Sequence, residues 1–441
     1  MKMLINMVSD FFYPNVGGVE EHIFNLSQCL LTRGHKVVVI THTYNDRKGI
    51  RYMTNGLKIY YLPVKVFYNQ SVLPTMICNL PFLRYIFIRE QIQIVHGHSA
   101  FSTLAHEAIT LGRLLNLKTV FTDHSLFGFA DSSAAVTNKF LQISLSGCHH
   151  CICVSHTGKE NTVLRARVPH AEVSVIPNAV DAATFVPEPE FRPKDRINII
   201  VISRLVYRKG IDLSVAVMSE LIPEYPNLHF IVGGDGPKRQ LLEELRENKG
   251  LGRITLLGAL EHSQVQNVLK TGHIFLNTSL TEAYCMAIVE AAACGLQVVS
   301  TRVGGIPEVL PEDLIYLTEP NVPSIVEGVK KALADRAAGK YVCPFECNER
   351  ISEMYSWDNV TRRTEIVYDA ILETSSEPFG DLLVRYLRSG VWPFLLVISL
   401  MKILVWLLEW AVPAKSIEIC RNFSLRKYNL SFDKQTSFPV N

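Results

Sequence analysis

Short apolar runs alternate with amphipathic stretches over most of the chain. In the first half, the apolar runs that predict strands are residues 3–9, 36–42, 57–62, 92–98, 118–124 and 151–155. Stretches with helical spacing lie between several of them. In residues 18–34, "GVEEHIFNLSQCLLTRG", Ile23, Leu26, Leu30 and Leu31 recur at the spacing of one helix face. Near-continuous apolar strands separated by helices indicate a parallel sheet that is covered on both faces.

The same alternation starts again after a linker rich in proline and charge, residues 184–196. The strand candidates of this second half are residues 197–205, 228–236, 254–260, 273–279 and 296–301. We therefore predict an α/β protein with two Rossmann-like, doubly wound domains, residues 1–183 and 197–375, that face a cleft. Ligands of such sheets bind at the carboxyl ends of the strands, where helix N-termini offer amides to anions.

The end of the chain differs from the rest. Val391–Pro413 is an apolar run with Lys402 and Glu409 as its charges, and it is long enough to cross a hydrocarbon core of about 30 Å. We predict a membrane helix at residues 390–413 and a tail at 414–441, and the two charges favour the alternative of a peripheral helix. Basic residues flank both ends, and the positive-inside rule puts the tail in the cytosol. A helix that lies in or re-enters one leaflet agrees with that bias.

Composition narrows the possible functions. The 441 residues carry a net charge of +2, which argues against a nucleic-acid partner. The ten cysteines form no regular disulfide framework, which favours a reducing compartment. The N-terminus predicts a first strand better than a signal peptide, so we expect the bulk of the chain in the cytosol. The segment "GCHHCIC", residues 147–153, would alternate faces along a strand, and we predict no metal there.

Glu282 and Glu290 stand in an otherwise small and apolar segment. A helix predicted from about Ala283 to Ala293, with Gly295 as its cap, would separate the two glutamates by about 12 Å. Carboxylates that hydrolyse a glycosidic bond stand about 5 to 9.5 Å apart. The pair is better spaced to hold two ends of an extended ligand, with the helix N-terminus between them for a diphosphate. The alternative is that both glutamates form local caps and pairs.

Further candidate residues follow strand ends. Arg204 and Lys209 suit phosphate oxygens, although such a pair is often only a solvated loop. Gly17 and Gly18 would allow close backbone approach to a ligand, and they lack the G-x-G-x-x-G spacing of nicotinamide enzymes. Three histidines, His96, His98 and His124, also end strands, where a structural role is as well supported as a functional one. The apolar stretch 72–90 predicts a core helix in preference to one on a bilayer.

Together these motifs resemble the retaining glycosyltransferases of family 4, which have the GT-B fold. The residues that carry the resemblance, in the order of the family, are "GGVEEH", "VHGHS", "TDHS", "VSHTGKENT", "IPNAVD", "SRLVYRKG", "GDGP", "TEAYCMAIVEAAACG" and "TRVGGIPEVL". The next to last of these contains the E-x7-E motif of the family. The resemblance covers residues 1 to about 370 and implies an acceptor-side first domain and a second domain that binds a UDP-sugar.

The resemblance implies a role for each candidate residue. Glu290 would hold the ribose hydroxyls, and Glu282 would meet sugar hydroxyls near the reacting carbon. The leaving diphosphate would be stabilised by Arg204 and Lys209, without a metal. Further donor-binding positions are Gly17, Gly18 and Met286, and His124 would contact the sugar hydroxymethyl group. The family often has glycine where this chain has Ala283 and Cys285, so the sugar pocket is expected to differ there.

More narrowly, "SHTGKENTVLRA" and the apolar C-terminal segment resemble the branch of the family that begins glycosylphosphatidylinositol anchor synthesis. That resemblance implies transfer of GlcNAc from UDP-GlcNAc to phosphatidylinositol by a multisubunit complex. The complex would lie in the endoplasmic reticulum membrane, with the catalytic domain on the cytosolic face. One alternative keeps the fold and changes the acceptor to another lipid or sugar. Another is a non-catalytic scaffold, for which degenerate motifs would be expected.

Overall fold

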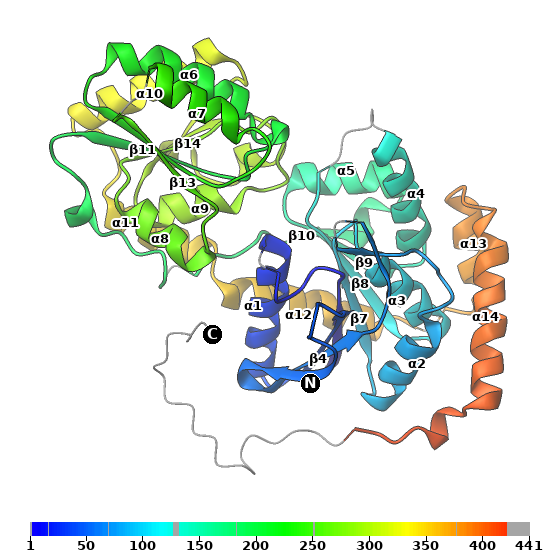
Figure 1. The fold of residues 1–441 in the computed structure, drawn as a ribbon. Helices are drawn as coiled ribbons and strands as arrows, with labels where there is room; N and C mark the ends of the chain where they lie inside the picture. The colour runs from blue at the N-terminus through cyan, green and yellow to red at the C-terminus, as the bar shows by residue number, and fades with distance from the viewer. Residues whose placement is uncertain are drawn as a thin grey trace.

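In the computed structural model, two parallel sheets form the cores of two units (Figure 1). The structure describes residues 2–15, 17–68, 70–126, 132–181, 183–249, 252–375 and 377–420. The predicted tail is thus described only as far as Cys420, and the rest of it lies outside the described residues.

The first sheet has eight strands in the order β10-β9-β8-β7-β1-β2-β4-β3. All neighbours pair in parallel except β3, which is antiparallel to β4. In chain order its strands are β1 (Leu4–Val8), β2 (Lys36–His42), β3 (Gly49–Met53), β4 (Leu57–Leu62), β7 (Ile94–His98), β8 (Lys118–Asp123), β9 (His150–Cys153) and β10 (Val173–Val175). A separate hairpin joins β5 (Val66–Tyr68) and β6 (Ser71–Val72).

Helices cover both faces of the first sheet. They are α1 (Gly18–Thr32), α2 (Leu80–Arg89), α3 (Thr103–Leu114), α4 (Ser132–Ser146) and α5 (His156–Ala166). Helix α1 packs on one face, in a cluster that includes Ile23, Leu26 and Leu30. Helices α2 and α3 pack on the opposite face. The stretch 72–90 therefore contributes a core helix, as predicted, because Leu83, Ile86 and other residues of α2 are buried.

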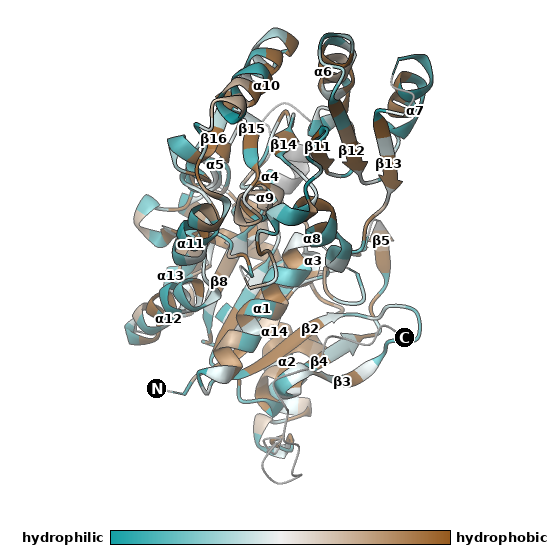
Figure 2. Cartoon of the chain, turned by 90° about the vertical axis from the view of Figure 1, so that its left-hand side faces the viewer, coloured by the Kyte–Doolittle hydropathy of each residue, from teal (hydrophilic) through white to brown (hydrophobic). Residues whose placement is uncertain are grey.

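The second sheet has six parallel strands in the order β13-β12-β11-β14-β15-β16. They are β11 (Ile197–Ile202), β12 (Leu228–Gly233), β13 (Ile254–Gly258), β14 (Ile274–Asn277), β15 (Gln297–Thr301) and β16 (Ile315–Thr318). Its helices are α6 (Ile211–Glu224), α7 (Arg239–Asn248), α8 (His262–Lys270), α9 (Met286–Ala293), α10 (Val322–Ala337) and α11 (Pro344–Met354). In Figure 2 the strands are mostly hydrophobic, whereas α6, α7 and α10 turn hydrophilic residues outward.

The chain returns to the first unit after α11, earlier than the expected boundary at residue 375. Helix α12 (Trp357–Glu373) packs against α1 and β8 and lies beside the first unit in Figure 1. It does so because its buried face, including Val367, Tyr368 and Ile371, completes the apolar cluster between α1 and the first sheet. Helices α13 (Phe379–Arg388) and α14 (Phe394–Ala411) follow on the same unit.

One helix in the described part of the chain, α14, has the length and apolarity to cross a membrane. The segment "GCHHCIC" contributes β9, as predicted. His149 lies near Arg113 and Thr119, whereas His150 contacts Ser174 Oγ at 2.8 Å. Since the two imidazoles have different neighbours, they do not converge on a common point.

The backbone at Gly210, directly after Lys209, packs closely against the residue that follows β14, Thr278. Gly210 has φ +65°, and a Cβ there would lie 1.8 Å from the carbonyl oxygen of Thr278. Gly339 has a similar φ of +67° with open space around it. We expect Gly210→Ala to destabilise the protein by about 3 kcal/mol or more, and Gly339→Ala by about 1 kcal/mol. Thermal unfolding midpoints of the two variants test this difference, and equal shifts would contradict the close contact.

Candidate functional site

A cleft of about 710 Å³ lies between the two units. This volume is within the usual range for small-molecule sites. Its walls come from the carboxyl ends of strands, as the sequence predicts. The first unit contributes residues that include Gly17, Gly18, His22 and Asn178. The second unit contributes the segments after β11, β12 and β13, the first turns of α8 and α9, and Arg204, Met286 and Glu290.

Two helices begin at the cleft. Helix α1 starts at Gly18 and α9 starts at Met286, and residues of both first turns line the walls. Their free amides and dipoles favour an anion at this point. A Cβ on Gly17 would lie 2.7 Å from Oε2 of Glu20, so a larger residue there would have to displace the end of this side chain. Burial raises the pKa of the Glu20 carboxyl, and the positive charge of Arg204 opposes that rise.

Lys209 and Glu282 form an ion pair between Lys209 Nζ and Glu282 Oε1. The hydroxyl of Ser279 also donates a hydrogen bond to Glu282 Oε1, at 2.9 Å. Burial alone would lower the pKa of Lys209, but the neighbouring Cys285 thiol and the Glu282 carboxylate raise it above the usual value. The lysine is therefore positively charged at neutral pH, and its direction is fixed by the carboxylate.

Glu282 lies before the helix and not within it. The expected start at about Ala283 was wrong by three residues, because α9 begins at Met286 after Cys285, which has φ +71°. The carbonyl oxygen of Glu282 accepts a hydrogen bond from Gly305 N at 3.0 Å, which holds the loop against the following segment. The predicted cap was confirmed, since Gly295 adopts φ +72° just after the helix.

Glu290 is buried, with an exposed fraction of 8%. Burial raises the pKa of its carboxyl to about 7, an effect that the positive charge of His262 opposes. His262 Nε2 lies 3.2 Å from Glu21 Oε1, so this pair joins α8 of the second unit to α1 of the first. The hydrogen bond with Glu21 raises the pKa of His262 to about 9. Charged groups of both units therefore meet beside Glu290.

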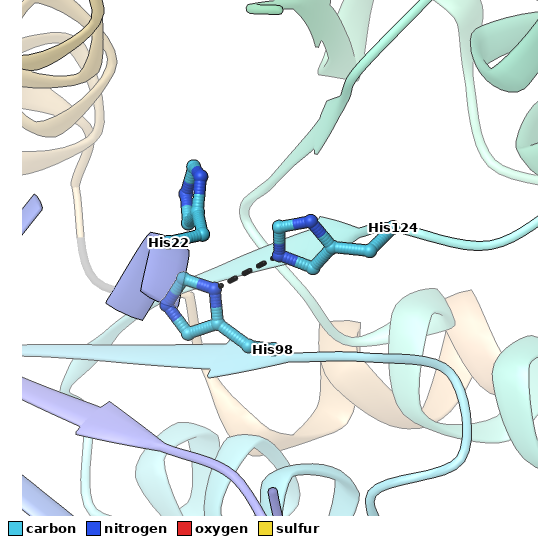
Figure 3. Close-up of side chains that lie close together, drawn as sticks. All are labelled: His22, His98 and His124. Atoms are coloured by element: carbon cyan, nitrogen blue, oxygen red, sulfur yellow. Dashed lines mark hydrogen bonds between the residues drawn. The ribbon is translucent and has the colours of Figure 1, made fainter. Parts of the chain in front are cut away.

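Three histidines cluster at the carboxyl ends of β7 and β8, next to α1 (Figure 3). His98 Nδ1 lies 3.4 Å from His124 Nε2, and the ring centroids of His22 and His124 are 4.7 Å apart. Burial lowers the pKa of His22 to about 4 and holds those of His98 and His124 well below the usual range. All three imidazoles are therefore neutral at pH 7. His96 lies deeper, bonded to the hydroxyls of Tyr368 and Thr122 at 2.7 Å.

The cluster also has the geometry of a metal site. Within the described residues, His22, His98 and His124 are the group whose possible ligand atoms all lie within 4.8 Å of one another. Three neutral imidazoles are ligands that Zn²⁺ accepts. A second use is hydrogen bonding to a bound ligand, because the side chains of His22 and Asn178, which lie next to each other, both line the cleft.

Most of the candidate residues come together around this cleft. Gly17, Gly18, Arg204, Met286 and Glu290 line it directly. His124 contacts the lining residue His22. Glu282 is close to the segment after β8, since a Cβ on Gly304 would meet both its carbonyl oxygen and the side chain of Leu126. Sequence reasoning did not single out four lining residues, Glu21, His22, Asn178 and His262. The motifs "GGVEEH" and "IPNAVD" contain the first three, and Trp357 joins them from α12 without any motif.

Comparison with known proteins identifies the family. A family described as PIGA (GPI anchor biosynthesis) matches residues 42–131, and one described as glycosyl transferases group 1 matches residues 184–349. The chain is 56% identical to a phosphatidylinositol N-acetylglucosaminyltransferase subunit of Homo sapiens, over 94% of this chain and 87% of the human protein. The chain belongs to this family of phosphatidylinositol N-acetylglucosaminyltransferase subunits. The Arabidopsis thaliana member is 52% identical, over 95% of this chain and 94% of its own length.

Solved structures support the fold that the resemblance implied. Sucrose-phosphate synthase from Thermosynechococcus elongatus aligns with a TM-score of 0.69 at 18% identity, over 85% of this chain and all of that chain. HepE of Anabaena, solved in complex with UDP, aligns with a TM-score of 0.65 at 15% identity, over 84% and 100%. The α/β GT-B fold is therefore confirmed, and the family name identifies this member as a glycosyltransferase.

The raised pKa of Glu290 has a consequence for stability. Because the folded protein disfavours its ionised form, stability is lost as the pH rises from the usual value of 4.5 to about 7. Glu290→Gln cannot ionise. We expect its stability advantage over the parent chain to grow across this window, up to about 3 kcal/mol. Thermal unfolding of both chains at pH 5 and pH 8 measures the growth, and midpoints that change in parallel would contradict it.

Proposed function

We propose that this protein transfers GlcNAc from UDP-GlcNAc to phosphatidylinositol, with retention, as the first step of glycosylphosphatidylinositol anchor synthesis. It would act as one subunit of a complex in the endoplasmic reticulum membrane, with the cleft on the cytosolic face. The names of relatives up to 56% identical support the reaction and the complex. The observation that carries the proposal is the cleft itself, which is lined by the buried Glu290, by Arg204 and by the first turns of two helices. Lys209, paired with Glu282, follows Arg204 on the same segment without lining the cleft.

The donor would lie along the second unit. Glu290, at the buried end of the cleft, would accept hydrogen bonds from the ribose hydroxyls. The diphosphate would lie at the N-termini of α1 and α9, near Gly17, Gly18 and Met286, with Arg204 and Lys209 as its cations. The ion pair with Glu282 already holds the ammonium group of Lys209 in position. The side chain would therefore not need to reorient as the diphosphate leaves.

The sugar would lie between Glu282 and the histidine cluster. Glu282 would accept hydrogen bonds from sugar hydroxyls near C1. His124 would contact the hydroxymethyl group from the side of the first unit. Since the imidazoles of the cluster are neutral, each can donate through one nitrogen and accept through the other.

The chemical step needs no separate base. The bond between C1 and the diphosphate oxygen breaks, and the inositol hydroxyl oxygen forms a bond to C1 on the same face. The hydroxyl proton passes to the leaving phosphate oxygen. Arg204 and Lys209 stabilise the negative charge that develops on the diphosphate, which is the role a metal has in other transferases. We therefore propose that no metal takes part, and that the histidine cluster serves the sugar.

Transfer of label from UDP-GlcNAc to endogenous lipid tests the reaction. Membranes would carry the chain with its partner subunits, and the product would be treated with a phosphatidylinositol-specific phospholipase. We expect a cleavable glycolipid, and we expect Glu290→Ala to lower transfer at least about 100-fold because charge-assisted hydrogen bonds to ribose are lost. The matched control is Glu327→Ala, an exposed glutamate on α10. A labelled lipid that resists the phospholipase would show that the acceptor is a lipid other than phosphatidylinositol. Absence of label would favour a non-catalytic scaffold.

A separate experiment tests whether a metal ion takes part in the reaction. We expect label transfer to be unchanged after incubation with a strong chelator, because in the proposed reaction Arg204, which lines the cleft, and the nearby Lys209 supply the positive charge. Lys209→Ala should lower transfer by at least about 100-fold, and added divalent cations should not restore it. Loss of activity with the chelator and recovery with Zn²⁺ would instead assign a metal to the histidine cluster.

A further inference from the structure

Two segments that carry the family resemblance meet where the two units touch. One is residues 154–162, "VSHTGKENT", which include the start of α5 in the first unit. The other is residues 301–310, "TRVGGIPEVL", which begin at the end of β15 in the second unit. Figure 1 shows α5 at the side of the first unit that faces the second. Neither segment takes part in the proposed reaction, so their contact needs a separate explanation.

Glu308 binds the N-terminus of α5 across this contact. Its Oε1 accepts hydrogen bonds from Thr157 N at 2.8 Å and from the Thr157 hydroxyl at 2.7 Å, and its Oε2 accepts one from His156 N. The N-terminus of a helix favours a negative charge, and hydrogen bonds to a carboxylate are stronger than neutral ones. The cap within the helix's own unit, Ser155 Oγ, accepts from Gly158 N. Glu308 therefore serves two amides that this cap leaves free.

Two glycines lie between the first unit and the loop before α9. A Cβ on Gly305 would lie 2.7 Å from Ser155 Oγ in the first unit and 2.1 Å from the carbonyl oxygen of Ala283. A Cβ on Gly304 would lie 2.1 Å from the carbonyl oxygen of Glu282. Because both glycines are in close contact with the loop, their segment cannot shift without moving the backbone that carries Glu282.

The same segment is hydrogen-bonded to that loop. Gly305 N donates to the carbonyl oxygen of Glu282 at 3.0 Å. The carboxylate of Glu282 in turn holds the ammonium group of Lys209. A continuous series of contacts thus runs from α5 through Glu308 and Gly305 to the ion pair of Glu282 and Lys209. It joins the first unit, which would hold the acceptor, to groups that would act on the sugar and the leaving diphosphate.

The alternative is that Glu308 only holds the units together. Val154 and Val180 of the first unit already pack in an apolar cluster with residues of the second. Apolar packing is non-directional, whereas three hydrogen bonds to one carboxylate restrict both distance and angle. Glu308 is exposed, and an exposed charge at a helix N-terminus adds little stability. The contact is therefore better suited to fix a position than to supply adhesion.

We propose that Glu308 is a positioning residue for the transfer step. By binding α5 it fixes the segment of Gly304 and Gly305, and through this segment it places Glu282 and Lys209 relative to the first unit. Glu308 acts through Glu282 and does not itself contact the substrates. This inference rests on the roles of Glu282 and Lys209 in the proposed function.

Steady-state transfer by the full complex tests the inference, with kcat expressed per UDP-binding site so that unfolded protein is not counted. We expect Glu308→Ala to lower kcat about 10- to 100-fold, because a small displacement of groups that act in the transition state is costly. The KM for UDP-GlcNAc and the Kd of UDP should stay within about twofold of the parent values. Glu308→Gln keeps one oxygen acceptor and should retain more activity. The matched control is Glu312→Ala, an exposed glutamate four residues further along the chain.

The partner of Glu308 in the first unit provides a second variant. Thr157→Val removes the hydroxyl that donates to Glu308 and keeps the backbone amide. We expect this change alone to lower kcat about threefold. Added to Glu308→Ala, it should lower kcat by a smaller factor, since the two groups act as a pair. Equal factors in the two backgrounds would contradict the inference.

Hydrogen exchange of the complex gives a readout that needs no sugar transfer. We expect the amides of residues 280–285 and of Gly305 to exchange faster in Glu308→Ala than in the parent chain, because the segment that holds this loop is released. The amides of α9, residues 286–293, should exchange at the parent rate and serve as the internal control. Unchanged exchange at residues 280–285 would overturn the inference.

The outcomes separate this inference from the proposed function. If the parent complex transfers GlcNAc and Glu308→Ala keeps its kcat, or loses activity only through KM, the inference fails and the proposed function stands. If the parent complex transfers no GlcNAc to phosphatidylinositol, the proposed function fails. Faster exchange at residues 280–285 in the variant would then still support the positional link from α5 to Glu282.

Discussion

Parallel pairing in both sheets is the constraint on which the site depends. A parallel sheet is covered by helices on both faces, so polar groups that must reach a ligand are confined to the strand ends. Here the carboxyl ends of β1 and β10 on one side, and of β11, β12 and β13 on the other, supply the walls of a single cleft. Helix α1 follows β1, and helix α9 follows the loop after β14. Both helices begin at this cleft, so two sets of free amides lie at its wall.

Polar contacts join the two units near the cleft. Glu308 accepts hydrogen bonds from Thr157 N at 2.8 Å and from His156 N, at the N-terminus of α5. A second polar contact joins α1 to α8, where Glu21 Oε1 lies 3.2 Å from His262 Nε2. The chain also connects the units a second time, because it leaves the second unit after α11 and α12 completes the core of the first. Apolar side chains join the units as well, since Val154 and Val180 of the first unit pack in the same buried cluster as residues of the second.

Much of this organisation could be predicted because the strands are runs of apolar, often β-branched residues. The boundaries of β2 and β4 agree with the expected runs 36–42 and 57–62. The structure adds two strands that were not predicted, β3, which is mostly exposed, and β16, which has only four residues. The position of α12 depends on tertiary burial of Val367 and Tyr368, which local sequence does not specify. Likewise, the positive φ of Cys285 delays the start of α9, so Glu282 lies before the helix. His262 reaches the site from α8 through its contact with Glu21, which the local sequence does not specify.

The charges of the cleft are distributed unequally, and this distribution bears on catalysis. On the side of the first unit, burial keeps His22, His98 and His124 neutral, so this histidine cluster adds no fixed charge. On the side of the second unit, Lys209 remains protonated through its neighbours, and Arg204 lies exposed in the wall. In the proposed reaction, the charge of Arg204 and Lys209 would lie beside the leaving diphosphate, where negative charge develops in the transition state.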